Sequence, residues 1–280
     1  MSEKLKARLL VALAATLSST SGFFVKSPIL ETIPEEAKPF VMGFWRAAFA
    51  LVVFLPMVRK MPFHPAMLLS GLCVFGMSGC FIASMSLTTS ATTIWLMCFA
   101  PFWVFLFGWL FGKEAVSFRR SVPLFLAMAG VSFILCFTLR HRGASALGLG
   151  LGVLSGLFFA CVIASLRYLR NYSSILLTTW NVGITLICFL PFMLGTGYFP
   201  TVSQLVMFAF FGIFQFALPY LLISRGLRKI SAQEGALITL LEPTLTPLWV
   251  WLAWGVAEPW WTLAGGMLVF IALVMKTLEE

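Results

Sequence analysis

The chain has 280 residues, of which 60% are apolar or aromatic and only 10% are charged. A soluble domain carries about 25% charged residues, so this composition, with a mean hydropathy of +0.99, excludes a soluble globular protein. The formal net charge of +9 indicates membrane topology rather than nucleic-acid binding, because the cations gather in particular loops.

Long apolar stretches follow one another, each sufficient to cross about 30 Å of hydrocarbon. The stretches are continuous rather than alternating, which favours α-helices over a β-barrel. We predict an all-α integral membrane protein with ten transmembrane helices and short connections, embedded in the lipid bilayer. The predicted spans are roughly 7–27, 39–58, 65–87, 90–111, 121–139, 145–166, 174–194, 202–224, 232–254 and 259–276.

The distribution of Lys and Arg predicts the orientation of these helices. With the N-terminus inside, most of the 19 basic residues fall on the inner side. Lys26, Lys38, Arg140 and Arg142 fall on the outer side, and Arg46 lies within a span. Because inner loops are enriched in Lys and Arg, we expect both termini in the cytoplasm. The basic start runs directly into the first span, so we expect no cleavable signal peptide.

The second half of the chain repeats landmarks of the first half. Arg46, in Trp45-Arg46, precedes Pro56 by ten residues, and Asn181, in Trp180-Asn181, precedes Pro191 by ten residues. The predicted repeats are 1–142 and 143–280, each with five helices. Since five is odd, the second copy must enter the membrane from the opposite side. Inverted repeats of this kind are typical of secondary transporters, whose substrate sits near mid-membrane between the repeats.

Both halves carry an ordered set of motifs in matching places. The first half has Gly22-Phe23-Phe24-Val25-Lys26, Arg46, Ser90-Ala91, Pro101 and Gly112-Lys113-Glu114, and the second has Gly226-Leu227-Arg228-Lys229-Ile230-Ser231-Ala232, Glu242-Pro243 and Glu258. In this set the sequence resembles the EamA-like branch of the drug/metabolite transporter superfamily. The resemblance implies a ten-helix bundle and alternating-access export, or less often import, of small metabolites. Ser21 stands where the family commonly has Trp, and the exit to Glu258 is longer than usual.

Glu242 is the most unusual residue of the span 232–254, because it places a carboxyl group beside Pro243 in mid-membrane. In a single unbroken helix, Glu234, Ile238 and Glu242 would share one face. Two readings of Glu242 stay open. It either contacts a cationic group of the substrate or carries a proton, or it pairs permanently with Arg46, since each buried charge is costly alone.

We expect a central cavity between the repeats with apolar and aromatic walls and few charges. Such walls suit small amphipathic metabolites better than multiply charged phosphates, which need several convergent cations. The expected lining residues are Ser21, Trp45, Arg46, Thr92, Trp95, Phe99, Trp180, Asn181, Gln215, Ile238, Thr239, Glu242 and Thr246. For the aromatic residues the alternative is bundle core, and for the polar ones it is hydrogen bonding between helices. Pro101 and Pro243 are expected hinges, or else static kinks.

These features predict a secondary active transporter of the bacterial inner membrane that moves small amphipathic metabolites such as amino acids, chiefly outward. We expect a small-molecule substrate, no nucleic acid, no cofactor and no metal, and one chain supplies a complete bundle, so a monomer suffices. The alternatives are a proton-coupled multidrug or organic-cation exporter that uses Glu242, and a non-transporting membrane scaffold. An enzyme is disfavoured, because the chain has no Asp and its two His lie in loops on opposite sides.

Overall fold

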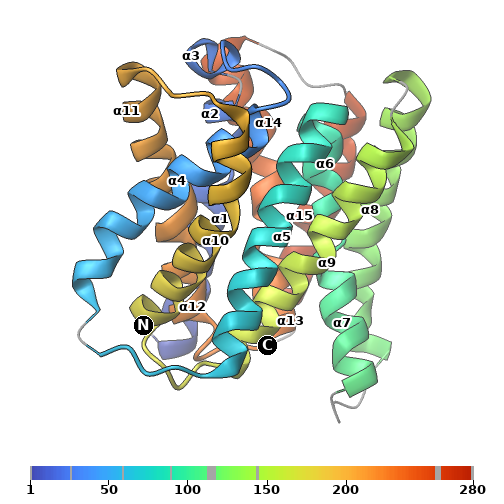
Figure 1. Ribbon diagram of the computed structural model, residues 1–280. Coiled ribbons are helices and arrows are strands. Elements are labelled where there is room, and N and C mark those ends of the chain that lie inside the picture. Colours follow the sequence, from blue (N-terminus) through green and yellow to red (C-terminus); the bar gives the residue numbers. More distant parts are fainter. Residues whose placement is uncertain are drawn as a thin grey trace.

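The computed structural model describes residues 2–25, 27–58, 60–88, 90–111, 118–142, 145–255 and 260–278, and the regular elements in these ranges are all helices (Figure 1). Lys26, Gly112-Lys113-Glu114 and Glu258, which contribute to the resemblance, lie outside the described residues.

The helices of the first half are α1 (Glu3–Ser18), α2 (Ser21–Val25), α3 (Pro28–Glu31), α4 (Lys38–Phe54), η1 (Leu55–Met57), α5 (Pro65–Leu87), α6 (Ser90–Met97), α7 (Ala100–Phe111) and α8 (Phe118–Arg142). Those of the second half are α9 (Ala146–Tyr168), α10 (Ser174–Thr196), α11 (Val202–Phe210), η2 (Phe211–Ala217), α12 (Leu218–Gly226), α13 (Ala232–Ile238), α14 (Leu241–Trp254) and α15 (Trp260–Leu278). Both chain ends lie at the same end of the bundle (Figure 1). We call it the terminal end, and the end that carries α3 the distal end.

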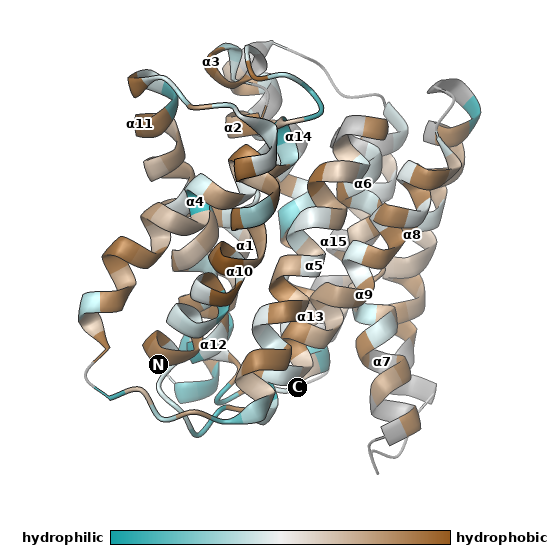
Figure 2. Ribbon diagram, viewed as in Figure 1, coloured by the Kyte–Doolittle hydropathy of each residue, from teal (hydrophilic) through white to brown (hydrophobic). Residues whose placement is uncertain are grey.

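Several helical segments are long and apolar enough to cross a membrane. Among the described residues there are 7, namely Glu3–Val25, Lys38–Met57, Pro65–Met85, Ala146–Tyr168, Ser174–Thr196, Val202–Gly226 and Ala232–Ala253. The remaining predicted spans coincide with α6 and α7, with α8 and with α15. Large apolar side chains such as Leu9, Val52 and Ile187 are exposed, and apolar residues dominate the helices along the bundle (Figure 2). The chain is therefore a multi-pass membrane protein whose outer surface contacts lipid.

Three of the predicted spans are broken helices rather than continuous ones, and the first of them, 7–27, is interrupted at Ser19 and Thr20. The other two are interrupted close to a proline. The span 232–254 is interrupted at Thr239 and Leu240, and the span 90–111 at Cys98 and Phe99. Both breaks lie just before a proline, which lacks an N–H and clashes with the carbonyl four residues earlier. The backbone tightens there into shorter turns, as in the 3.0 Å bond from the Glu242 N–H to the Thr239 carbonyl. The expectation of one unbroken helix at 232–254 was wrong.

The helices of the two halves pack in a reciprocal pattern. The first helix of the first half (α1) packs on α12, and the first helix of the second half (α9) packs on α5. Likewise α4 packs on η2 as α10 packs on α5, while α4 pairs with α10 and α8 pairs with α15. Exchanging the halves leaves this set of contacts unchanged, which is how two structural repeats facing each other would pack.

Candidate functional site

Arg46 is the charged group at the centre of the contact between the two halves. It lies midway along α4 and is only 4% exposed. Its Nη2 donates a hydrogen bond of 2.7 Å to Ser78 Oγ on α5. The Nε atom is buried and has no hydrogen-bond acceptor among the described residues. The guanidinium is therefore held on one side and left unsatisfied on another.

Two phenylalanine rings of η2 hold the same guanidinium. Its Cζ lies 4.5 Å from the ring centroid of Phe216 and 5.3 Å from that of Phe211. Residues five apart would point about 140° away from each other on an α-helix. In a π-helix, the hydrogen bond from i to i+5 brings them onto one face. The π-helical backbone of η2 is thus what places both rings against Arg46.

Gly212 allows η2 to approach α4 closely enough for these contacts. A Cβ atom added at Gly212 would lie 2.1 Å from the Arg46 carbonyl oxygen. That distance is far below any tolerated contact, and the neighbour is backbone rather than a flexible side chain. The cation–π cage of Arg46 therefore requires glycine at this position.

Glu242 follows the break between α13 and α14 and is 7% exposed. Among the described residues its carboxylate has no hydrogen-bond or ion-pair partner, and it forms no ion pair with Arg46 within 4.0 Å. The permanent pairing of Glu242 with Arg46, which the sequence left open, is absent from this structure. The hydroxyl of Tyr220, on α12, donates to Met77 Sδ at 3.3 Å.

The break in the first span lies beside η2 and α14. Residues Ser19 and Thr20 separate α1 from α2. Gln215 Nε2 donates to the Ser18 carbonyl at 3.1 Å, and Trp249 Nε1 donates to Ser19 Oγ at 2.7 Å. The Ser18 carbonyl and the Ser19 hydroxyl, which lie at the break, therefore accept hydrogen bonds from side chains of the second half.

Two of the predicted lining residues beside this break retain unsatisfied atoms. The Ser21 hydroxyl and the Gln215 Oε1 are buried and have no partner among the described residues. Asn181 on α10 likewise has a buried, unsatisfied Nδ2. Such groups are expensive in a lipid environment. Each of these atoms could still bind a polar partner that the described residues do not supply.

The other predicted lining residues are distributed over three environments. Trp95 is fully buried and packs in a hydrophobic cluster with Leu124, Leu237 and Ala272, and Phe99 packs on the same cluster. These positions match the alternative of bundle core. Trp180 packs edge to face on Phe63 of the loop before α5, with ring centroids 5.6 Å apart.

The five remaining predicted lining residues lie within helices or at a helix end. Trp45 packs on Phe44 and its indole N–H is buried without a partner among the described residues. Thr239 and Thr246 donate to carbonyls of their own helices, those of Ala236 and Glu242. Ile238 and Thr92 are buried. Hydroxyls bonded to their own backbone offer an acceptor lone pair to a ligand without leaving a buried donor unsatisfied.

Glu234, which precedes the break in the span 232–254, forms an ion pair at the terminal end. Its Oε1 accepts from Arg8 Nε at 2.5 Å, which joins α13 to α1 at the terminal end. Arg167 Nη1 also donates to the Leu227 carbonyl at 2.7 Å across that end. The Arg8–Glu234 ion pair therefore joins the two halves at the terminal end, and the Arg167 hydrogen bond holds α9 to the segment after α12 within the second half.

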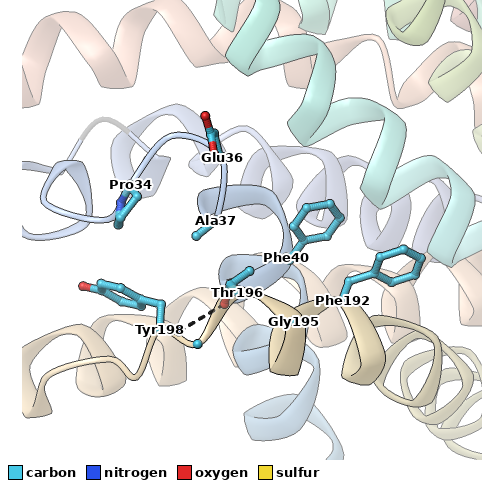
Figure 3. A pocket seen from close by; sticks show the side chains of 9 residues that line it. Pro34, Glu36, Ala37, Phe40, Phe192, Gly195, Thr196 and Tyr198 are labelled. Atoms are coloured by element: carbon cyan, nitrogen blue, oxygen red, sulfur yellow. Dashed lines mark hydrogen bonds between the residues drawn. The ribbon is translucent and has the colours of Figure 1, made fainter.

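A pocket of about 540 Å³ opens at the distal end (Figure 3). It lies between the segment from Pro34 to Phe40 and the end of α10, where Gly197 adopts a positive φ of 63°. Phe40 stacks on Phe192 with ring centroids 5.3 Å apart, and Tyr198 faces Pro34. None of the predicted cavity residues lines this pocket. It belongs to the distal mouth of the bundle rather than to the Arg46 region.

The sequence did not reveal Ser78, Phe211, Gly212 and Phe216 as residues of the site. Ser78 appears in the sequence as one of several small residues of its helix, which indicate packing. The two phenylalanines lie in a helix rich in phenylalanine, where nothing marks a π-helical turn. Only the spacing of five between Phe211 and Phe216 distinguishes them in retrospect.

Comparison with models of protein families identifies the family of this chain. The model of the EamA-like transporter family matches twice, at residues 5–136 and 146–278. The chain belongs to the EamA-like transporter family. The transporter is also 25% identical over 272 residues to a protein of Archaeoglobus fulgidus (strain ATCC 49558 / DSM 4304 / JCM 9628 / NBRC 100126 / VC-16) described as an uncharacterized transporter, covering 96% of this chain and 95% of that protein.

A solved crystal structure supports the fold of the transporter independently. It superimposes with a TM-score of 0.76 over 97% of this chain and 96% of its own, at 15% sequence identity. At that identity the similarity establishes the fold alone. As a family transporter in a lipid bilayer, the protein acts on a small-molecule substrate.

Proposed function

We propose that the protein is a secondary active transporter that exports small amphipathic metabolites, amino acids or related compounds, by alternating access. The observation that carries this proposal is the buried, incompletely satisfied Arg46 where α4 meets η2, a contact between the two halves. Ionisable residues inside a membrane bundle are costly, and they mark substrate pathways and coupling sites. The apolar and aromatic surroundings suit an amphipathic molecule.

The proposed architecture is ten helices in two inverted repeats, residues 1–142 and 143–280. Two family-model matches of similar length support it. The reciprocal helix contacts support it as well. So does the matching position of the two breaks, each just before Pro101 or Pro243. In this architecture the first, fourth and ninth helices are discontinuous, and discontinuous helices in transporters lie next to the substrate.

The proposed transport cycle uses the breaks before Pro101 and Pro243 as hinges. The Arg8–Glu234 ion pair closes the terminal end in this conformation, and it would have to open for substrate to enter from that side. The pocket at the distal end lies on the opposite side (Figure 3). Release through the distal mouth would make the protein an exporter if the terminal end is cytoplasmic.

The proposed location is the bacterial inner membrane, with both chain ends in the cytoplasm. Basic residues such as Arg8, Arg167 and Arg228 lie near the terminal end, as expected for cytoplasmic loops. One chain supplies both repeats, so the proposed working unit is a monomer.

A second function has a specific observation in its favour. Glu242 is buried and has no partner among the described residues, as a proton-carrying carboxyl of a multidrug or organic-cation exporter would be. The substitution Glu242→Gln separates the two functions. We expect amino-acid flux with unchanged pH dependence if the carboxyl does not couple transport, and loss of the pH dependence if it does. Glu3→Gln, at an exposed residue, is the matched control.

Flux into proteoliposomes tests the proposed function directly. The purified full chain would be reconstituted and offered a panel of radiolabelled amino acids and organic cations, with protein-free vesicles as the control. We expect saturable flux of amino acids that unlabelled substrate competes away. Absence of flux for every compound would favour a non-transporting scaffold.

A further inference from the structure

The charge of Arg46 requires a counter-charge that the described residues do not supply. No carboxylate of the described residues lies within 4.0 Å of its guanidinium, although the side chain is 4% exposed. Breaking a buried pair by removing one partner is strongly destabilising, and intramembrane cations normally pair with anions or carbonyls. Ser78 supplies a neutral acceptor only. A ligand is the natural source of the missing negative charge.

The geometry around the guanidinium selects the kind of anion. Its hydrogen-bond donors lie in the plane of the group, at its edge. Phe211 and Phe216 approach its Cζ through their rings, and Ser78 takes one donor of Nη2. The unsatisfied Nε shares its edge of the guanidinium with Nη2, one of whose two donors goes to Ser78, so a carboxylate on this edge would accept directly from Nε.

We infer that Arg46, with Ser78, Phe211 and Phe216, forms a subsite for the carboxylate of a monocarboxylate that has an apolar or aromatic body. The inference rests on the proposed transport function and names the substrate class of the same site. A single cation matches one negative charge, whereas phosphate dianions need several convergent cations. Phe216 and Tyr220, whose rings pack 5.4 Å apart at an angle of 79°, provide an apolar wall beside the subsite.

A ligand ammonium group, where present, has a separate acceptor in Glu242. Arg46 and Glu242 do not form an ion pair within 4.0 Å, and the buried Glu242 carboxylate has no ion-pair partner among the described residues. We therefore expect the ligand carboxylate to be necessary for neutralising Arg46, while the ligand amino group only adds to the affinity. A carboxylate subsite should therefore bind acids more tightly than amines, whereas a site for organic cations should show the reverse order.

Four compounds with one phenyl body test the ranking without any substitution. They are 3-phenylpropionate, phenylalanine, phenylalaninamide and phenethylamine, each added to the detergent-purified full chain at constant ionic strength. We expect the two carboxylates to raise the unfolding temperature at concentrations about tenfold lower than the amide or the amine, since a charge-assisted hydrogen bond gives this factor. Sodium sulfate controls for a general effect of anions. Equal shifts by acid and amide, an equal shift by sulfate, or no shift at all would overturn the inference.

Variants of Arg46 test whether this side chain causes the preference for the acid over the amide. In Arg46→Gln, we expect the preference for acid over amide to fall to about one, and in Arg46→Lys to an intermediate value, because lysine keeps the charge without the fork. Ser70→Ala, at another buried serine of α5 without a partner among the described residues, should keep the full preference. Size-exclusion chromatography establishes folding. A full preference retained by folded Arg46→Gln would contradict the assignment.

Flux in proteoliposomes distinguishes failure of the subsite from failure of the transport proposal. Carboxylates that stabilise the detergent-purified protein but never cross the vesicle membrane would leave the subsite standing and reject transport. Equal flux of phenylalanine and phenylalaninamide would support transport and reject the subsite.

Discussion

The helix pair α1 and α12 differs from its counterpart, the pair α9 and α5, although the two pairs occupy matching places in the halves. Both α5 and α9 are continuous helices of 23 residues. The first span is broken at Ser19 and Thr20, and the helix that ends in α12 contains the π-helical η2. The α5–α9 pair thus satisfies its backbone groups within continuous helices. In the α1–α12 pair, the break leaves a backbone carbonyl that accepts a hydrogen bond from a side chain.

Side chains at the two pairs follow the same division. Between α5 and α9, glycine packing dominates: a Cβ at Gly76 would lie 2.9 Å from the Phe158 ring. The buried Ser84 hydroxyl there donates to the Gly148 carbonyl at 2.7 Å and is also bonded to Thr93. Next to α1 and α12, Ser21 and Gln215 retain unsatisfied atoms. In the proposed mechanism the α5–α9 contact acts mainly as scaffold, although α5 also supplies Ser78 to the Arg46 subsite, and the irregular pair supplies further polar groups for a ligand.

The largest effect is expected where the irregular pair meets α4. Gly212→Ala places a Cβ 2.1 Å from the Arg46 carbonyl oxygen, and we expect loss of folded protein or destabilisation of about 3 kcal/mol or more. In Gly156→Ala, on the regular pair, the closest atom is the Met97 carbonyl oxygen at 3.0 Å, and we expect about 1–2 kcal/mol. Thermal unfolding in detergent measures both.

The control for these glycine variants is Gly150→Ala, since nothing lies within 4 Å of a Cβ at Gly150. There alanine should be neutral or slightly stabilising because of its higher helix propensity. Equal destabilisation by Gly212→Ala and Gly150→Ala would remove the distinction between a close backbone approach and an ordinary helical glycine.

An intermediate effect is expected at the terminal end. Glu234→Ala leaves Arg8, whose side chain is 20% exposed, without its carboxylate, and we expect a loss of about 1–3 kcal/mol. Opening this end should also become easier, so the apparent affinity for cytoplasmic substrate should change. Unfolding in detergent and flux from the cytoplasmic side measure the two effects.

A charge swap and a surface pair control the Glu234 experiment. Arg8→Glu combined with Glu234→Arg should recover part of the lost stability. Glu3→Ala, which removes the exposed pair with Lys6, should leave the unfolding temperature unchanged. A loss of the same size in Glu3→Ala would show that charge number, rather than the α1–α13 contact, determines the effect.

The smallest effect is expected at the break between α1 and α2. Trp249→Phe removes the 2.7 Å hydrogen bond to Ser19 and should cost about 0.5–1.5 kcal/mol while changing the transport rate. Ser84→Ala removes hydrogen bonds of the regular pair and should lower stability by a similar amount without changing the rate. Proteoliposome flux normalised to folded protein measures the rates. A rate change in Ser84→Ala alone would reverse the division between scaffold and ligand side.

The sequence by itself determined the membrane class, the repeated landmarks and the family. Apolar runs of spanning length are required by the bilayer, and they are visible without any tertiary information. The prolines at 101 and 243 and the charge at Arg46 were also correctly singled out as unusual, since their chemistry is exceptional inside a helix whatever surrounds them.

Only the tertiary structure decided how those residues are satisfied. The break at Thr239 and Leu240 lies between Glu234 and Glu242, and Glu234 pairs with Arg8 on α1, neither of which the sequence spacing predicts. Arg46 contacts two rings five residues apart, which depends on a π-helical turn that local sequence does not encode. Backbone hydrogen bonds from i to i+5 are much rarer than those from i to i+4, so local sequence alone favours the α-helix. Packing of η2 on α4, permitted by Gly212, selects between them.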